Sequence, residues 1–333
     1  MRSLRNKVVV LTGASSGFGR GAALRFAEEG ASLVLAARRK GLLKEVAEEC
    51  RARGAKALAV ETDVSQREDV ERLAEKALDK FGHVDVWVNN AGVATYGEFD
   101  KVPLKEHEQV IRTDVLGTMV GSYEAIKHFR ERRRGVLINM SSYLGKGSAP
   151  FHSSYVAAKH AVRGLGMALR QDLQVEGFDN VHVCTIMPTS HDTPFFDHAG
   201  NYTGKPVKPT KPFYDPQQVI ETIVRLAVEP EPEVMVGTSA KVASVAGKFM
   251  PSLLEKRMAK KVKKEHYSQR EEVGDSSGAV MEPMSEGRDV RAGWEQREGG
   301  SGAWKWAMLG LVPVAAMAAV KIARSRGDMA RAA

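Results

Sequence analysis

The chain has 333 residues, enough for one large α/β domain and an extension. Cys50 and Cys184 lie far apart, without metal-ligand spacing or a secretory leader before them, so we expect a reducing compartment and no metal site. Much of the formal net charge of +8 falls in residues 241–270, but no recognition module or interleaved aromatic residue accompanies it, which argues against nucleic-acid binding.

The chain opens with a β-branched run at 7–11, a glycine-rich turn at 12–19 and a helical pattern at 22–27. Such glycines let backbone amides approach a pyrophosphate, and the helix N-terminus adds unpaired N–H groups. The alternative is an ordinary tight turn, but strand and helix flank this one as a dinucleotide site requires. We assign to that site the residues Thr12, Gly13, Ser15, Ser16, Gly17, Phe18 and Gly19.

A second strand-like run at 32–37 ends in Arg38 and Arg39, where an NAD-selective site would place an acidic residue against the ribose hydroxyls. Arginines can instead pair bidentately with a 2′-phosphate, so we predict NADP(H) over NAD(H). Alternatively, the two arginines only begin a solvated helix.

Ser142 follows the strand-like run 138–142, and Tyr155 and Lys159 follow at helical spacing. Residues four apart share a helix face, so the ammonium favours the phenolate of a tyrosine whose ordinary pKa is about 10. Ser142 would donate a hydrogen bond to the substrate oxygen. Alternatively, the spacing arises by chance and Ser142 caps the next element. The combination points to hydride transfer.

Together these motifs resemble the short-chain dehydrogenase/reductase family over residues 1–237. The resemblance also includes Asp63-Val64, residues 89–92, and Pro188 with Thr193. It implies one Rossmann-type domain, a doubly wound parallel sheet of about seven strands with helices on both faces, that binds cofactor and substrate. The family is usually dimeric or tetrameric, so we expect a homo-oligomer.

The resemblance also implies roles for these residues. Tyr155 would donate the proton during reduction, Lys159 would bind the nicotinamide ribose and lower the pKa of the tyrosine, and Ser142 would orient the carbonyl. Asp63 and Val64 would lie against the adenine, and Pro188 and Thr193 beside the nicotinamide. The implied cofactor-binding set further includes Asn90, Ala91 and Gly92, with Tyr155 and Lys159.

Two residues depart from the family pattern. Asp114 replaces the asparagine whose backbone carbonyl completes a catalytic tetrad, and Thr189 replaces the glycine that usually follows Pro188. A buried carboxylate either competes for the Lys159 ammonium or is satisfied by nearby amides, and we favour the second. Thr189 is expected to reshape the loop that leads to Thr193.

Several aromatic and histidine side chains are candidates for the substrate pocket. His152 precedes Tyr155 by three residues, either as a pocket residue or as a loop residue. The segment around Thr193 resembles the lid from which the family draws specificity. It carries candidates for an apolar pocket, or for core contacts: His191, Phe195, Phe196, His198 and Tyr202.

Beyond the catalytic domain, residues 238–270 form a basic extension with apolar residues at helical spacing. This helix either lies on an anionic membrane or packs its apolar stripe on the domain. Residues 271–302 are rich in Gly, Ser and Glu and predict a flexible linker.

Residues 303–323 are predominantly apolar, and a basic tail follows at 324–333. The uncharged part covers about 22 Å, but lysines that snorkel at both ends extend it towards the roughly 30 Å of a bilayer core. We predict a membrane anchor, either spanning or interfacial, with the catalytic domain in the cytoplasm where NADP(H) is supplied. The alternative is a buried helix or an oligomer contact.

The sequence thus predicts an NADP(H)-dependent oxidoreductase that interconverts a carbonyl and a secondary alcohol on a lipophilic substrate. A cofactor-binding scaffold or redox-sensing protein remains as an alternative, for which Asp114 speaks. An epimerase or dehydratase is a third reading, against which the intact Ser142, Tyr155 and Lys159 speak.

Overall fold

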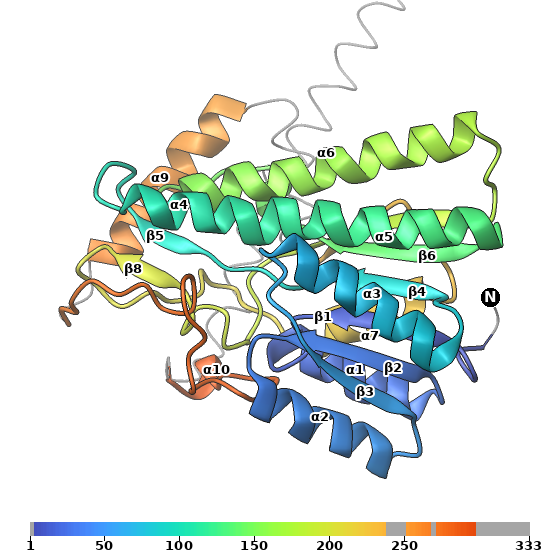
Figure 1. Cartoon of the computed structure of the whole chain (residues 1–333). Helices are drawn as coiled ribbons and strands as arrows, with labels where there is room; N and C mark the ends of the chain where they lie inside the picture. Colours follow the sequence, from blue (N-terminus) through green and yellow to red (C-terminus); the bar gives the residue numbers. More distant parts are fainter. Residues whose placement is uncertain (1–2, 238–250, 268–270, 298–333) are drawn as a thin grey trace, which may run out of the picture.

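The computed structural model describes residues 3–237, 251–267 and 271–297, and its centre is a parallel sheet in the order β3-β2-β1-β4-β6-β7-β9 (Figure 1). This confirms the predicted doubly wound sheet of about seven strands. The strands are β1 (Val8–Thr12), β2 (Ser32–Ala37), β3 (Ala57–Glu61), β4 (Val86–Asn89), β6 (Gly135–Met140), β7 (Val181–Pro188) and β9 (Glu233–Val236).

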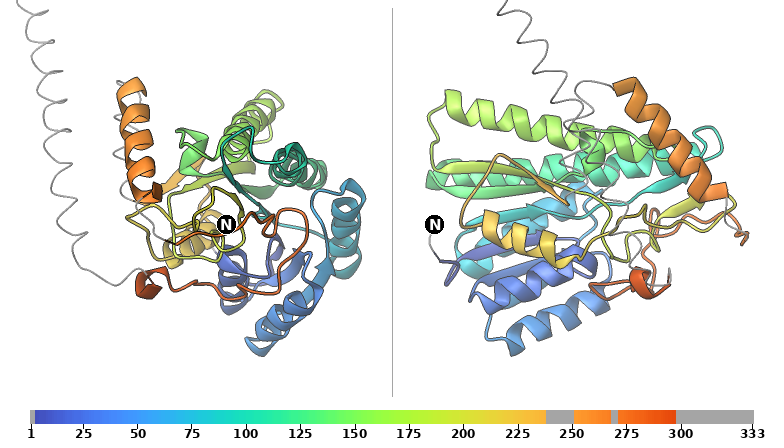
Figure 2. Two further views of the ribbon diagram at one scale, coloured as in Figure 1. Left: turned by 90° about the vertical axis from the view of Figure 1, so that its left-hand side faces the viewer. Right: turned by 180° about the vertical axis from the view of Figure 1, so that it is seen from behind.

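Helices cover both faces of the sheet, also as predicted, and α7 lies beside α1 when the molecule is seen from behind (Figure 2). One face carries α1 (Gly17–Glu28), α2 (Lys40–Ala52) and α7 (Gln217–Leu226). The other carries α3 (Arg67–Phe81), α5 (Gly117–Arg132) and α6 (Ser153–Val175), with α4 (Leu104–Ile111) and the π-helical turn η1 (Arg112–Leu116) leading into α5.

The strands are almost wholly apolar because both of their faces are buried. Alternate side chains of a strand point to opposite faces. Thus Val9 and Leu11 of β1 pack with Phe26 of α1, whereas Val8 and Val10 pack with Phe129 of α5. Cys184 on β7 is 1% exposed and belongs to this core.

The topology places a crevice at the carboxyl ends of the central strands. The chain leaves β1 towards β2 on one side and returns to β4 on the other, so the loops after β1 and β4 diverge. Ligands of open α/β sheets bind in such a crevice. A small sheet of β5 (Thr95–Gly97) and β8 (Gly200–Tyr202) and the 3₁₀ turn η2 (Tyr143–Gly145) lie on the substrate side.

The C-terminal part departs from the sequence prediction. Residues 271–297, expected to form a flexible linker, pack against the catalytic domain and end in α10 (Trp294–Arg297). A few apolar side chains suffice to hold the segment on the domain, because Val280 is fully buried and Trp294 is 5% exposed. Backbone hydrogen bonds between Asn201 and Ser276 add to the contact.

Helix α9 (Pro251–Tyr267) is the basic helix predicted within 238–270. Within residues 3–237, 251–267 and 271–297, no helix combines the length and apolar character needed to cross a membrane. The predicted anchor at 303–323 and the tail at 324–333 lie outside the described residues.

Candidate active site

The glycine-rich turn between β1 and α1 adopts a conformation that side chains would obstruct. Gly13 has a φ of +66°, and a Cβ there would lie 2.8 Å from Asn90 Nδ2. A Cβ on Gly19 would lie 2.1 Å from the Gly13 carbonyl oxygen. The absent side chains let the turn pack closely against Asn90 and Ala91, which places the first turn of α1 at the cavity, where a helix N-terminus can bind a phosphate.

Thr12 holds the diverging loops in place from behind. Its hydroxyl accepts hydrogen bonds from the backbone amides of Asn90 (3.0 Å) and Ala91 (3.1 Å). The Asn90 side chain returns a hydrogen bond of 3.0 Å to the Thr12 carbonyl. The ends of β1 and β4 are therefore fixed relative to each other.

A cavity of about 800 Å³ runs from this turn across the carboxyl ends of the strands. It brings together most of the site residues predicted from the sequence, whereas Thr12, Gly19 and Asp114 lie behind its wall. The predicted residues that line it are Gly13, Ser15, Ser16, Gly17, Phe18, Arg38, Arg39, Asp63, Val64, Asn90, Ala91, Gly92, Ser142, Tyr155, Lys159, Pro188 and Thr193.

Ser142, Tyr155 and Lys159 meet in this cavity. The Lys159 Nζ lies 5.2 Å from the centre of the Tyr155 ring and donates a 3.1 Å hydrogen bond to the Met140 carbonyl at the end of β6. The Ser142 side chain shares the cavity with Tyr155 and lowers the pKa of its phenol. Its hydroxyl also accepts from the Leu144 amide at 3.1 Å, so it both caps η2 and faces the tyrosine.

Asp114, on η1, lies directly behind Lys159. Its Oδ2 is 2.8 Å from Lys159 Nζ, and its Oδ1 accepts a 2.8 Å hydrogen bond from the Val93 amide. The expectation that nearby amides satisfy this carboxylate is therefore incomplete, because only one amide does so and the ammonium provides the other contact. A Cβ on Gly92 would lie 3.1 Å from Asp114 Oδ2, so the pair also needs a small residue there.

The electrostatics of this group reflect burial. Burial raises the pKa of Tyr155, while Lys159 lowers it, Asp114 raises it and Ser142 lowers it. The ammonium thus acts in the expected direction, but burial outweighs it. Burial would lower the pKa of Lys159, yet attraction to Asp114 and Tyr155 raises it above its ordinary value. The chain Asp114, Lys159, Tyr155 and Ser142 can move a proton to or from an oxygen in the cavity.

Beyond Tyr155 the cavity is lined mainly by apolar and aromatic side chains. Tyr96 stacks edge-on against His152, with ring centres 4.2 Å apart, and Phe195 lies 5.5 Å from Tyr155. Burial lowers the pKa of His152 to about 4, so this imidazole is neutral. His152, His191, Phe195, Phe196 and His198 all line the cavity.

Tyr202 does not line the cavity. Its hydroxyl donates a 2.8 Å hydrogen bond to the buried Glu106, away from the site. Its prediction as a possible pocket residue is therefore wrong, and the alternative of an internal contact holds. Thr189 is bound through its amide and hydroxyl to the Val236 carbonyl, which ties the loop after β7 to the end of β9.

Other cavity residues were not foreseen. Tyr96 and Phe151 belong to no recognisable motif, and only the fold brings them to the cavity wall. Met258 and Val262 of α9 reach the cavity, which favours the packed alternative for this helix, and their spacing of four residues was the available signal. The segment that was expected to be a linker also contributes unforeseen residues, namely Ala279, Pro283 and Met284.

A family model described as short chain dehydrogenase matches residues 7–201. The chain belongs to the short-chain dehydrogenase/reductase family. The oxidoreductase YxnA of Bacillus subtilis is 37% identical over 78% of this chain and 73% of its own length. The 3beta-hydroxysteroid dehydrogenase 1 of Eggerthella lenta is 37% identical over 57% of this chain and 73% of its own length.

Two solved structures of the family are similar in fold. A short-chain dehydrogenase/reductase from Burkholderia phymatum in complex with NAD has a TM-score of 0.69 and 27% identity, covering 77% of this chain and 97% of its own. The alcohol dehydrogenase of Thermococcus sibiricus with 5-hydroxy-NADP has a TM-score of 0.59 and 28% identity, covering 70% and 96%. The chain is thus an oxidoreductase with the NAD(P)-binding fold of this family.

Proposed function

We propose that this chain interconverts a carbonyl and a secondary alcohol, with Tyr155 as general acid and base, NADP(H) as the preferred cofactor and a lipophilic substrate. The observation that carries the proposal is the convergence of Ser142, Tyr155 and Lys159 on one cavity, with the Lys159 Nζ 5.2 Å from the centre of the Tyr155 ring. A bound nicotinamide supplies or accepts the hydride. Ser142 orients the substrate oxygen, and Tyr155 gives it a proton during reduction.

The preference for NADP(H) is supported by Arg38 and Arg39 at the end of β2. No carboxylate forms an ion pair with either guanidinium among the described residues. Burial and the neighbouring Arg38 both lower the pKa of Arg39. A 2′-phosphate would relieve this repulsion between two cations, whereas a ribose hydroxyl would not.

The lipophilic substrate is supported by the lining of the cavity around Tyr155. The apolar contributors come from four separate parts of the fold, so the character does not depend on one loop. They are Leu144, Phe151, Phe195, Phe196, Val207, Met258 and Val262. The relative from Eggerthella lenta is named for a hydroxysteroid, which is compatible with such a substrate.

The experiment is NADPH consumption by detergent-solubilised full-length protein against matched polar and lipophilic carbonyls. We expect turnover of lipophilic ketones or aldehydes, and its loss in Tyr155→Phe, which keeps the ring but removes the proton. Turnover of polar carbonyls alone would contradict the substrate class. Equal activity of Tyr155→Phe would contradict the role of the tyrosine.

We also propose that the chain associates with a membrane through residues 303–323, with its catalytic domain in the cytoplasm, and works as a homo-oligomer. The apolar composition of 303–323 supports the first point. Carbonate extraction tests it, since an embedded protein stays in the membrane fraction and a peripheral one is released. Size-exclusion chromatography with light scattering, in detergent, tests the oligomer.

A second candidate function is a cofactor-binding scaffold with little turnover. The ion pair between Asp114 and Lys159 favours it, because a lysine held by a carboxylate is less free to bind ribose hydroxyls. Tight NADPH binding without turnover of any carbonyl, and turnover gained in Asp114→Asn, would favour this alternative over the first.

A further inference from the structure

The segment 279–294, here called the strap, lies across the cofactor side of the cavity and is anchored at both ends. At one end Val280 packs against Val93, Val110 and Ala158. At the other, the Trp294 amide donates a 2.9 Å hydrogen bond to Asp192 Oδ1, and its indole N–H donates to the Thr193 carbonyl at 3.3 Å. The strap is therefore docked by contacts that lie outside the arginine site.

Between its anchors the strap presents backbone carbonyls to the two arginines. Arg38 donates to the carbonyls of Ala279 and Met281, the latter at 3.1 Å. Arg39 Nη1 lies 2.9 Å from the Glu286 carbonyl and 3.4 Å from that of Met284. None of these contacts uses a strap side chain.

The remaining donors of Arg39 are also engaged. Its Nε and Nη2 donate to the hydroxyls of Ser15 (3.1 Å) and Ser16 (2.6 Å), on the glycine-rich turn. The Gly17 amide, at the start of α1, donates to the Asp289 carbonyl at 3.0 Å. Strap oxygens thus occupy donors that an anionic phosphate would take at this end of the cavity.

A phosphate and the strap therefore compete for the same N–H groups. A phosphate pairs with a guanidinium through two parallel hydrogen bonds between opposite charges, whereas a backbone carbonyl is a neutral acceptor, so a 2′-phosphate can displace the carbonyls. The ribose hydroxyls of NAD(H) are neutral and have no such advantage. The Gly17 amide faces the pyrophosphate of either cofactor, so its contact with Asp289 does not distinguish them, and only the contacts of Arg38 and Arg39 with the strap depend on the 2′-phosphate.

We propose that the strap is a specificity-determining element, an internal ligand of Arg38 and Arg39 that the 2′-phosphate of NADP(H) must displace from the arginines and that NAD(H) leaves bound to them. This rests on the proposed binding of a 2′-phosphate by the arginines. Work spent on undocking the strap subtracts from the affinity for NADP(H) alone. The strap thereby reduces the ratio of NADP(H) affinity to NAD(H) affinity that Arg38 and Arg39 would give without it.

The proposal is tested first on the unaltered full-length protein by hydrogen–deuterium exchange. At equal saturation, NADP⁺ is expected to speed exchange of the amides in 279–294 relative to NAD⁺, including those of Ala279, Ala292 and Trp294, which are hydrogen-bonded when the strap is docked. Equal exchange with both cofactors, or slower exchange with NADP⁺, would overturn it.

The second test weakens each anchor separately, with Trp294→Ala and Val280→Ser, and measures dissociation constants for NADPH and NADH at one ionic strength. We expect NADPH to bind several-fold more tightly and NADH to change by less than about twofold. A parallel change for both cofactors would contradict the proposal. Arg39→Ala separates the two ideas: if it leaves the NADPH to NADH ratio of the parent unchanged, the arginine site itself is wrong, whatever the strap does.

Discussion

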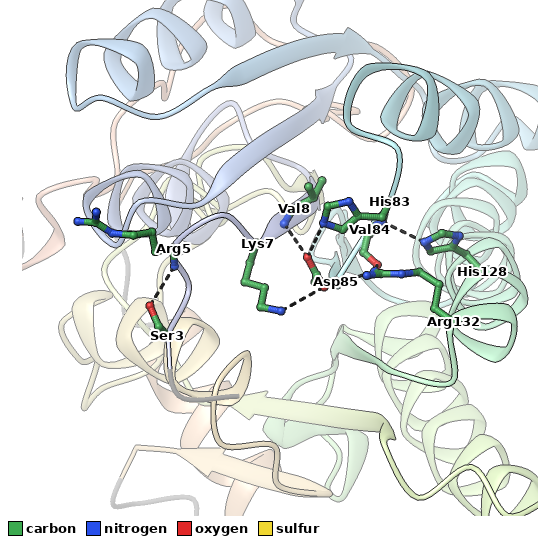
Figure 3. A network of polar contacts seen from close by, with 9 residues as sticks. All are labelled: Ser3, Arg5, Lys7, Val8, His83, Val84, Asp85, His128 and Arg132. Atoms are coloured by element: carbon green, nitrogen blue, oxygen red, sulfur yellow. Dashed lines mark hydrogen bonds and ion pairs between the residues drawn. The ribbon is translucent and has the colours of Figure 1, made fainter.

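The two ends of the parallel sheet each hold a buried carboxylate, and the two are paired very differently. At the amino end, Asp85 is 1% exposed and is surrounded by Lys7, His83 and Arg132, with its Oδ2 accepting a 3.0 Å hydrogen bond from the Val8 amide (Figure 3). At the carboxyl end, Asp114 is fully buried and pairs with a single cation among the described residues, Lys159, which also lies beside the Tyr155 ring.

Their pKa values move in opposite directions for this reason. Burial pushes the pKa of Asp85 up, but the Val8 amide together with Lys7, Arg132 and His83 outweighs it, so the pKa is lowered. For Asp114 burial is not outweighed by Lys159 and the Val93 amide, and the pKa is raised. The polar groups at the amino end all have partners and serve the structure. The pair of Asp114 and Lys159 at the carboxyl end instead influences the pKa of Tyr155.

Breaking the pair at the carboxyl end should have the largest effect. Lys159→Met removes the positive charge beside Tyr155 and leaves Asp114 buried without a cation. We expect kcat to fall about 10²- to 10⁴-fold and the free energy of unfolding at neutral pH to fall by about 3 kcal/mol. Steady-state kinetics and urea denaturation measure the two effects.

The double variant Lys159→Met, Asp114→Asn is the control. It should regain most of the stability, because no unpaired charge remains, and none of the activity. A double variant as unstable as Lys159→Met would show that the packing of the lysine, and not its charge, supports this end of the sheet.

At the amino end the effect should be on stability alone. Asp85→Ala removes the acceptor that joins β1 to the residues before β4 and leaves Lys7 and Arg132 close together without their counter-charge. We expect a loss of about 3 kcal/mol in unfolding free energy and a kcat within about twofold of the parent at a temperature where both are folded. A large loss of kcat in folded Asp85→Ala would remove the distinction between the two ends.

The sheet and much of the site at its carboxyl end could be predicted from the sequence, because both depend on short patterns of neighbouring residues. A β-branched run before Thr12 predicts the first strand, and the four-residue spacing of Tyr155 and Lys159 places both side chains on one helix face. The parallel order of the strands then follows from alternation with helices. Asp114 was also visible, but its distance to Lys159 depends on the π-helical turn η1, which no short pattern predicts.

The amino-end cluster and the strap could not be predicted, for two different physical reasons. Lys7, His83 and Arg132 are separated along the chain, and each alone resembles a solvated charge. The strap binds Arg38 and Arg39 through backbone carbonyls, which every residue possesses, so its sequence does not indicate the contact.

The influence of Asp114 on the chemistry can be isolated with Asp114→Asn. Its negative charge raises the pKa of Tyr155, so the substitution should lower that pKa. Reduction needs the protonated phenol, and its alkaline limb should move to lower pH. Alcohol oxidation needs the phenolate, and its acid limb should move the same way. Profiles of kcat/KM against pH measure both, and Asp85→Asn, which removes a buried carboxylate at the other end, should move neither.

The smallest expected effect concerns the pH dependence of stability at the amino end. The folded pKa of Asp85 lies below its unfolded value, so its stabilisation is fully present above the unfolded pKa of about 3.9 and is lost as pH falls through the folded pKa. The difference in unfolding free energy between the parent and Asp85→Asn should therefore stay constant from pH 7 to about pH 5 and shrink below about pH 4. Urea titrations across this range measure it. A difference that stayed constant down to pH 2 would mean that the hydrogen-bonding shape of the side chain, which asparagine largely keeps, and not the carboxylate charge, holds this end of the sheet together.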